Sequence, residues 1–132
     1  MAALDRPVVK PRPVYLDLLH IRQPLPAIVS ILHRASGALL FLVGIPFVLW
    51  LVPRALASPE GWEAMRGFLA HPVARLVLLV LAWAYLHHFI AGIRHLLMDL
   101  HIGMQLKSAR TSAAVTLVLS LLLTLGVAIR LW

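Results

Sequence analysis

The stretch of sequence that decides the fold is AIVSILHRASGALLFLVGIPFVLWLV, residues 27–52 of the 132-residue chain. Apart from His33, Arg34 and a few small residues it is apolar, and it exceeds the roughly 20 residues that a helix needs to cross the hydrocarbon core of a bilayer. Backbone polar groups find no water in that core, so a crossing segment satisfies them within itself, as an α-helix does. The stretch is therefore predicted to be a transmembrane helix, with Pro46 as a point where it could kink.

Two further apolar runs predict two further spans. The three transmembrane helices are expected at about residues 27–53, 73–98 and 110–131. The composition agrees, because 61% of the residues are hydrophobic and 13% are charged, whereas soluble domains are about half apolar and about a quarter charged. The expected fold class is an all-α membrane protein, a single domain over residues 1–132 that forms part of a heteromeric helix bundle. The sequence has no internal repeat, which gives little support to a small transporter subunit.

The segments outside the spans carry turn signals. Residues 1–26 are predicted to form an extended or interfacial arm, since Pro24 and Pro26 disfavour a helix there, and they contain no apolar core of a signal peptide. Between the first two spans, SPEG at residues 58–61 predicts a turn, and residues 62–69 could form a short helix at the membrane interface. The rest of this connection is expected to be an exposed loop.

The formal net charge of +7 comes from basic residues scattered along the chain, a distribution typical of contact with anionic lipid headgroups and not of nucleic-acid binding. Lysine and arginine near the ends of spans favour the cytoplasmic side. Six lie on one side and four on the other, namely Arg6, Lys10, Arg12, Arg22, Lys107 and Arg110 against Arg54, Arg66, Arg75 and Arg130. The N-terminus and the second loop are thus predicted to be cytoplasmic and the C-terminus periplasmic.

The chain contains no cysteine. Disulfides and cysteine-ligated iron–sulfur clusters are therefore excluded within it. Any electrons that reach this protein must come from a partner or reside on another cofactor.

A polar face is predicted in the first span. Ser30, His33 and Arg34 are spaced i, i+3 and i+4 and so share one side of a helix. Gly37 and Gly44 continue a stripe of small residues that lets another helix or a flat cofactor approach. Serine and arginine can hydrogen-bond the oxygens of a quinone head group or of haem propionates. The alternative is that His33 and Arg34 extend to the nearby interface while the glycines only pack helices.

The second span ends in AYLHHFIAGIRHLLMD, where ionisable side chains are costly and indicate a function. By helical periodicity His88, Gly92 and His95 share one face, and His87 and Arg94 share another about 100° round. His88 is expected near the middle of the membrane, where imidazole is a candidate haem ligand and Gly92 would leave room for the porphyrin edge. Spacing alone does not separate His87 from His88, and a membrane histidine more often hydrogen-bonds a neighbouring helix than binds iron.

A second axial ligand is not expected from this chain. His95 lies about 10 Å from His88 along the same helix, and His33 is expected several ångströms nearer the cytoplasmic surface. Together with Arg34 and Arg94, these two histidines are predicted at the depth where haem propionates would need cationic partners. Arg94 could equally be an interfacial anchor.

Two segments, RPVYLDLLHIRQPLPAIVSILHRASG (residues 12–37) and HHFIAGIRHLLMD (residues 87–99), closely resemble the cytochrome b membrane-anchor subunit of bacterial succinate dehydrogenase. This enzyme is the succinate:quinone oxidoreductase of respiratory complex II. The SPEG turn also looks like members of that family, and the resemblance covers nearly the whole chain. It implies that electrons from succinate oxidation pass through iron–sulfur centres to ubiquinone.

The resemblance implies roles for individual residues of the first span. The family's SxxHR motif falls on Ser30, His33 and Arg34. In the family, the serine and the arginine help to form the ubiquinone site near the iron–sulfur subunit. The histidine lies beside the haem propionates, so His33 and Arg34 are also expected at the haem.

The family's HxxxGxRH motif falls on His88, Gly92, Arg94 and His95. Its first histidine is the axial ligand of the haem b iron, so the resemblance makes His88 the metal ligand and places Gly92 and His95 beside the haem. The opposite ligand comes from the sister anchor subunit. His87 departs from the family, which usually has an aromatic residue at that position.

The family also implies partners and a location. These are a second membrane anchor that shares haem b, an iron–sulfur subunit and a flavoprotein, the last two carrying the iron–sulfur clusters and FAD. The four would form a heterotetramer, which could assemble further into trimers, in the bacterial cytoplasmic membrane. The alternatives are a fumarate reductase anchor that uses menaquinol, and a structural anchor that binds haem without a quinone role.

Overall fold

A computed structural model describes residues 20–132, so most of the predicted N-terminal arm lies outside the described residues. Within them the chain is almost entirely helical and has no strand. The helices are α1 Leu25–Leu39, η1 Leu40–Gly44, α2 Ile45–Ala57, α3 Pro59–Ala70, α4 Pro72–Asp99 and α5 Leu106–Leu131. The predicted all-α fold is confirmed.

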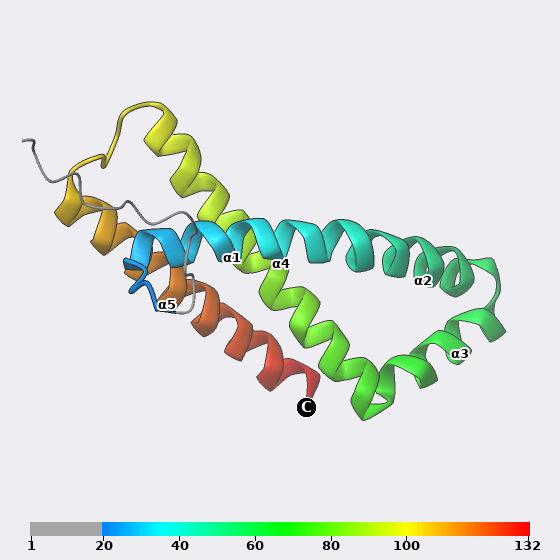
Figure 1. The fold of residues 1–132 in the computed structure, drawn as a ribbon. Coiled ribbons are helices and arrows are strands. Elements are labelled where there is room, and N and C mark those ends of the chain that lie inside the picture. Colours follow the sequence, from blue (N-terminus) through cyan, green and yellow to red (C-terminus); the bar gives the residue numbers. More distant parts are fainter. Residues whose placement is uncertain (1–19) are drawn as a thin grey trace, which may run out of the picture.

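Three helical stretches are long and apolar enough to cross a membrane, as predicted. The first is continuous through α1, η1 and α2 over 33 residues, and the others are α4 with 28 residues and α5 with 26. In Figure 1, α1 and α2 run on as one long helix that crosses α4, α3 leads the chain back to α4, and α5 lies beside α4. Helix α4 therefore packs against both α1 and α5, and its two polar faces meet different neighbours.

The first span widens into a π-helix just before Pro46. In this segment, Leu40–Gly44, backbone hydrogen bonds join residues five apart instead of four. The N–H of Ile45, for example, donates to the carbonyl of Leu40. A proline in a regular α-helix has no N–H to donate, and its ring clashes with the carbonyl four residues back. The wider turn relieves that clash, so the irregularity expected at Pro46 takes the form of a π segment.

The connection between the first two spans is helical, so α3 confirms the short helix predicted at residues 62–69, whereas the loop predicted for the rest of the connection is wrong. Helix α2 continues to Ala57 and α3 begins at Pro59, so Ser58 alone separates them. The Ser58 side chain caps α3, its Oγ accepting a hydrogen bond of 3.1 Å from the N–H of Gly61, as serine commonly does at a helix N-terminus. A side chain at Gly61 would overlap the carbonyl oxygen of Arg54, so the tight junction requires glycine.

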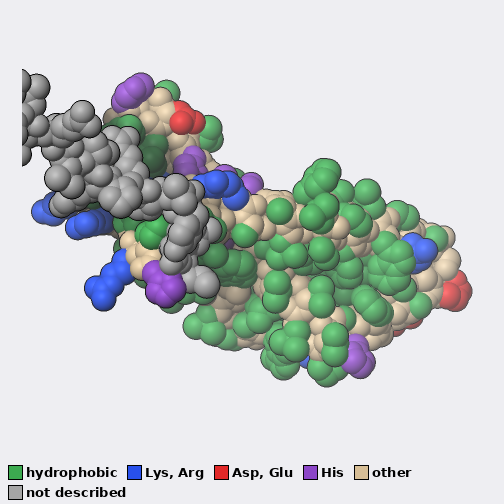
Figure 2. Space-filling model, in the orientation of Figure 1, with side chains coloured by type: hydrophobic (Ala, Val, Ile, Leu, Met, Phe, Trp, Pro, Cys, Tyr) green, Lys and Arg blue, Asp and Glu red, His purple; other side chains and the backbone are tan. Residues whose placement is uncertain are grey.

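The interior of the three-helix unit is small and partly polar. Its apolar core consists of Val29, Ala91 and Ala113, and small residues of this kind let membrane helices approach closely. Ala74 and Ala84 are also buried, and the buried polar side chains are Ser36, His87, Arg94, Thr116 and Ser120. Large apolar side chains instead cover the outside, as Figure 2 shows. A surface of this kind suits lipid or partner helices, and the polar side chains are directed inward.

Candidate functional site

His88 of α4 lies against the polar face of α1. Its Nδ1 is 3.0 Å from the backbone carbonyl oxygen of His33 and 3.3 Å from Oγ of Ser36. A carbonyl oxygen can only accept, so Nδ1 of a neutral His88 carries the proton and Nε2 carries the lone pair. No hydrogen bond from residues 20–132 occupies that Nε2.

Gly37 allows the His88 ring to lie on α1. A Cβ at this position would be 2.8 Å from Cε1 of His88, closer than non-bonded carbon atoms approach. Gly44, further along the same stripe, is buried and faces Leu81 of α4 at ordinary contact distance. The stripe of small residues therefore brings α4 close to α1.

His33 fills the space between His88 and His95. The rings of His33 and His88 are stacked with centroids 4.1 Å apart and planes 12° apart, and the ring of His95 is 5.0 Å away at 42°. Gly92 faces Nε2 of His33, which would be 3.6 Å from a Cβ there. The structure thus brings His33, His88, Gly92 and His95 together, and His33 occupies the space that was expected to admit a porphyrin edge at Gly92.

The rings of His33 and His88 touch, although His33 was expected several ångströms nearer the cytoplasmic surface, and the depth of each ring in the membrane stays a prediction. The prediction placed each residue by counting along its own helix. Helix α1 crosses α4, however, and a crossing brings residues together at whatever depth the axes meet.

Ser30 and Arg34 form a pair one helical turn apart on α1. The guanidinium of Arg34 donates from Nη2 to Oγ of Ser30 and from Nε to the Ser30 carbonyl, both at 3.4 Å. Ser30 is half-buried, whereas Arg34 is exposed. The pair presents a hydroxyl and a guanidinium at the surface, next to the histidine cluster.

The other face of α4 is closed by α5. His87 is fully enclosed, its Nδ1 lies 3.3 Å from Oγ of Ser120, and its ring stacks on Trp83 with centroids 5.5 Å apart. Its Nε2 is buried and has no hydrogen-bond partner among residues 20–132, and the same holds for Nε2 of His95. His87 is therefore a packing residue between helices.

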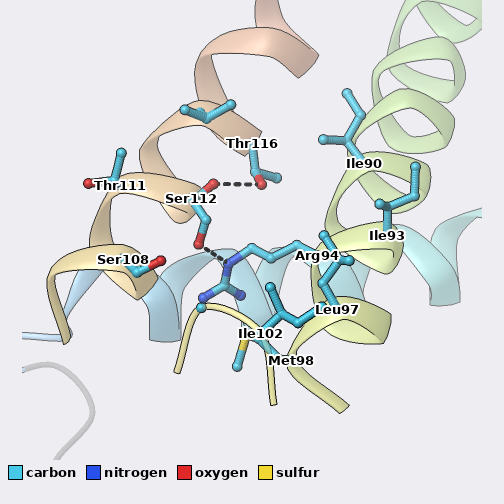
Figure 3. Close-up of a pocket in the computed structure, with 12 residues that line it drawn as sticks. Ile90, Ile93, Arg94, Leu97, Met98, Ile102, Ser108, Thr111, Ser112 and Thr116 are labelled. Carbon is cyan, nitrogen blue, oxygen red and sulfur yellow. Dashed lines mark hydrogen bonds between the residues drawn. The ribbon is translucent and has the colours of Figure 1, made fainter. Parts of the chain in front are cut away.

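Arg94 also points toward α5. Its Nε donates to Oγ of Ser112 at 3.0 Å (Figure 3), and its Nη2 donates to the carbonyl of Ala109 at 3.5 Å. Arg94 therefore does not join the cluster of His33 and His95, because the periodicity of α4 turns it away from the α1 face, and its place beside haem propionates stays a prediction.

No bare metal centre is formed in the described part of the chain, since residues 20–132 contain no group of three histidine or acidic side chains arranged around one point. His88 offers a single in-plane nitrogen. A metal bound there would need its remaining ligands from a macrocycle or from another chain.

Comparison with known proteins identifies the family of this helical unit. Residues 9–127 match the family described as succinate dehydrogenase/fumarate reductase transmembrane subunit. The chain belongs to this family. It is 38% identical over 122 residues to the succinate dehydrogenase cytochrome b556 subunit of Coxiella burnetii, covering 92% of this chain and 97% of that protein.

Two further relatives agree with the assignment. The succinate dehydrogenase cytochrome b556 subunit of Paracoccus denitrificans is 31% identical over 102 residues, covering 77% of this chain and 78% of the relative. The subunit of the same name from Rickettsia prowazekii is 26% identical over 125 residues, covering 95% and 97%. The chain is therefore a cytochrome b membrane anchor of the succinate dehydrogenase type, as the resemblance indicated.

Two residues of this anchor were missed by the sequence reasoning. Ser36 is 1% exposed and contacts His88, and Ser120 contacts His87. Ser36 lies three residues after His33, so helical spacing could have placed it on the polar face. Ser120 belongs to a polar stripe of α5 in which Ser112, Thr116, Ser120 and Thr124 recur every four residues, so spacing could have shown its face, although only the packing of α5 on α4 reveals its partner.

Proposed function

We propose that this succinate dehydrogenase anchor binds haem b through His88 and forms part of a ubiquinone-reduction site with Ser30 and Arg34. Succinate would be oxidised on a flavoprotein partner, and electrons would pass through the clusters of an iron–sulfur partner to the quinone. The absence of cysteine from this chain fits such a division of cofactors. The names of the relatives support the succinate dehydrogenase assignment over a fumarate reductase anchor.

The hydrogen bond from Nδ1 of His88 to the carbonyl of His33 carries the haem proposal. Metal-binding histidines commonly donate their other ring N–H to a carbonyl, which fixes the tautomer and raises the basicity of the ligating nitrogen. His87 differs from His88 because its Nδ1 faces the Ser120 hydroxyl and the protein encloses its ring on all sides. A flat macrocycle has access to the half-buried His88 and not to His87.

The stacked His33 ring does not block His88. The lone pair of an imidazole nitrogen lies in the plane of the ring, whereas His33 covers the flat face of His88. For the same reason His33, whose ring face covers the ring of His88, would not hold the same metal together with Nε2 of His88. The second ligand would come from the sister anchor subunit.

The residues beside His88 fit the edge of a haem. Nε2 of His95 is unpaired within residues 20–132 but buried beside the His33 ring, so it would hydrogen-bond a carboxylate only after the surrounding side chains shift. His33 and Arg34 supply further donors on the same side of the unit, and charged donors of this kind suit propionates. When bound, haem b would supply one-electron redox capacity, while these side chains hold and orient it.

Ser30 and Arg34 suit a quinone head group. Arg34 donates in a planar fork that stays charged, and the Ser30 hydroxyl can donate to a second oxygen. Their mutual contacts of 3.4 Å are long for hydrogen bonds, so both can turn to a ligand at little cost. Reduction takes two electrons and two protons, and the protons would come from water or partner residues, because no carboxylate among residues 20–132 hydrogen-bonds to this pair.

The complex would be a heterotetramer of this chain with a second anchor, the iron–sulfur subunit and the flavoprotein. It would lie in the bacterial cytoplasmic membrane with the α4–α5 loop cytoplasmic, as the lysine and arginine balance favours. Ser30, Arg34 and the α4–α5 loop would then lie toward the side from which electrons arrive.

The haem assignment is tested by optical spectra of membranes that carry His88→Ala or His87→Ala. We expect the b-type signal, measured per assembled complex, to be lost in His88→Ala and retained in His87→Ala. Loss only in the His87 variant would show that the wrong histidine was chosen. Retention in both would remove this chain from the haem site.

A further inference from the structure

A cavity of about 420 Å³ opens between α4, α5 and the loop that joins them, on the side of α4 away from the histidine cluster. Its walls are mostly apolar, and Ile90, Ile93 and Val115 are among the lining residues. Arg94 is also among them, and Figure 3 shows its guanidinium beside the hydroxyl-bearing start of α5. The cavity thus combines an apolar wall with one cation.

Arg94 is a buried charge with only neutral partners. It is 6% exposed, and its hydrogen bonds go to the Ser112 hydroxyl and the Ala109 carbonyl. Within residues 20–132 no carboxylate forms an ion pair with it. An unneutralised charge at membrane depth is costly and is normally paired, so the site calls for an anion from outside the described chain.

The length of α4 places Arg94 near the expected edge of the hydrocarbon core. Helix α4 has 28 residues, which at 1.5 Å per residue is about 42 Å, whereas the hydrocarbon core is about 30 Å thick. Arg94 lies five residues before Asp99, so it is about 7 Å from the end of the helix. If α4 is centred in the bilayer, this is the boundary between hydrocarbon and headgroups.

We propose that this cavity binds one anionic phospholipid from the leaflet on the side of the α4–α5 loop. The phosphate would accept hydrogen bonds from Arg94 and from the hydroxyls of Ser108 and Thr111, which line the same cavity. An acyl chain would lie on the apolar wall formed by Ile93 and Val115. A small soluble anion would satisfy the charge but leave this wall uncovered, so the two features together specify an amphiphile.

The test uses the purified complex of this chain with its partner subunits, stripped of lipid in a neutral detergent. Phosphatidylglycerol or phosphatidylcholine with identical acyl chains is added, and bound lipid is counted by native mass spectrometry while thermal unfolding is followed. The wild type should bind phosphatidylglycerol at least tenfold more tightly at this site than phosphatidylcholine. Arg94→Gln should abolish that preference, whereas Arg110→Gln, an exposed arginine outside the lining, should keep it.

A second pair of variants tests the cavity without touching the charge. Val115→Trp fills the lining, whereas Val118→Trp places the same bulk three residues on, at an exposed position outside it. Binding of phosphatidylglycerol should fall at least tenfold in the first and stay unchanged in the second. This pair decides the question even if Arg94→Gln fails to assemble.

Four results would overturn the proposal. These are equal binding of both lipids by the wild type, an undiminished preference in Arg94→Gln, wild-type binding in Val115→Trp, and no lipid retained because a partner side chain fills the cavity. Inorganic phosphate is the control for an anion without acyl chains. If it stabilised the complex as strongly as phosphatidylglycerol at the same concentration, the site would be one for a free anion.

Discussion

Helix α4 carries two adjacent histidines, His88 and His87, on different faces. The two faces differ in whether a ring nitrogen of the histidine remains accessible. On the α1 face, the proton of His88 goes to a backbone carbonyl, and its second nitrogen stays open in the plane of the ring. On the α5 face, His87 is fully buried, its Nδ1 lies beside Oγ of Ser120, and its buried Nε2 has no hydrogen-bond partner among residues 20–132. A rotation of about 100° between consecutive helical residues separates a candidate ligand from a packing residue.

The arginines show the same division. Arg34 on α1 is exposed and loosely held by Ser30, so it can turn to a ligand. Arg94 is buried and held by Ser112 at 3.0 Å. The exposed arginine suits a substrate that enters and leaves, and the buried one suits a ligand that stays. The weakly bonded Arg34 and the partly accessible ring of His88 thus both lie on the α1 side.

The largest expected effect on haem binding comes from filling the space on α1 in which the His88 ring lies. Gly37→Val places a side chain where the His88 ring lies, so the ring must move and the complex should lose most of its b-type haem signal. The control is Gly126→Val on α5, where a Cβ meets nothing within 4 Å and the signal should persist. A normal spectrum in Gly37→Val would show that the contact with α1 is not needed to hold His88.

Removing the exposed arginine should act on turnover and spare assembly. Arg34→Ala deletes a charged donor to the quinone oxygens, and the loss of one such donor from an active site lowers turnover about a hundredfold. Quinone-linked succinate oxidation should fall accordingly, while reduction of an artificial dye by the flavoprotein partner stays intact. Arg110→Ala, an exposed arginine at the start of α5, should change neither rate. Unchanged quinone turnover in Arg34→Ala would eliminate the quinone role.

The smallest effects should distinguish the two serines that contact the histidines. Ser36→Ala removes an acceptor near Nδ1 of His88, which lowers the basicity of the proposed ligand and should make the haem potential more positive. Ser120→Ala should leave the potential unchanged and destabilise the helix packing by about 0.6 kcal/mol, the average for interhelical hydrogen bonds in a membrane. Redox titration and thermal unfolding of both variants provide the measurement. A shift of potential in Ser120→Ala alone would reverse the proposed roles of the two faces.

The sequence predicts the spans and the angular order of the polar residues well. Long apolar runs leave few alternatives to helices, and periodicity correctly separates His88 and His95 from His87 and Arg94. Periodicity gives angles around one helix, however, and does not say which neighbour each face meets. The contact of His88 with Gly37 and the burial of Arg94 against α5 depend on how the helices cross, which pattern alone does not determine.

Segment ends were harder to predict than spans. Ser58 could serve either as a turn residue or as a helix cap, and the structure uses it as a cap, so α3 starts at once. Proline and glycine in this region suggested a loop, yet Pro59 occupies the first turn of α3, where a missing N–H costs nothing. Local signals of this kind mark a boundary without giving the length of the segment beyond it.

The π segment Leu40–Gly44 amounts to one residue inserted into the first span. Such an insertion turns everything beyond it by about 100° relative to a regular α-helix. The half with Ser30, His33 and Gly37 keeps its fit to α4, while the half that leads to α3 has a register of its own. The directions in which the two halves point are therefore set separately, so that the first half meets α4 and the second half meets α3.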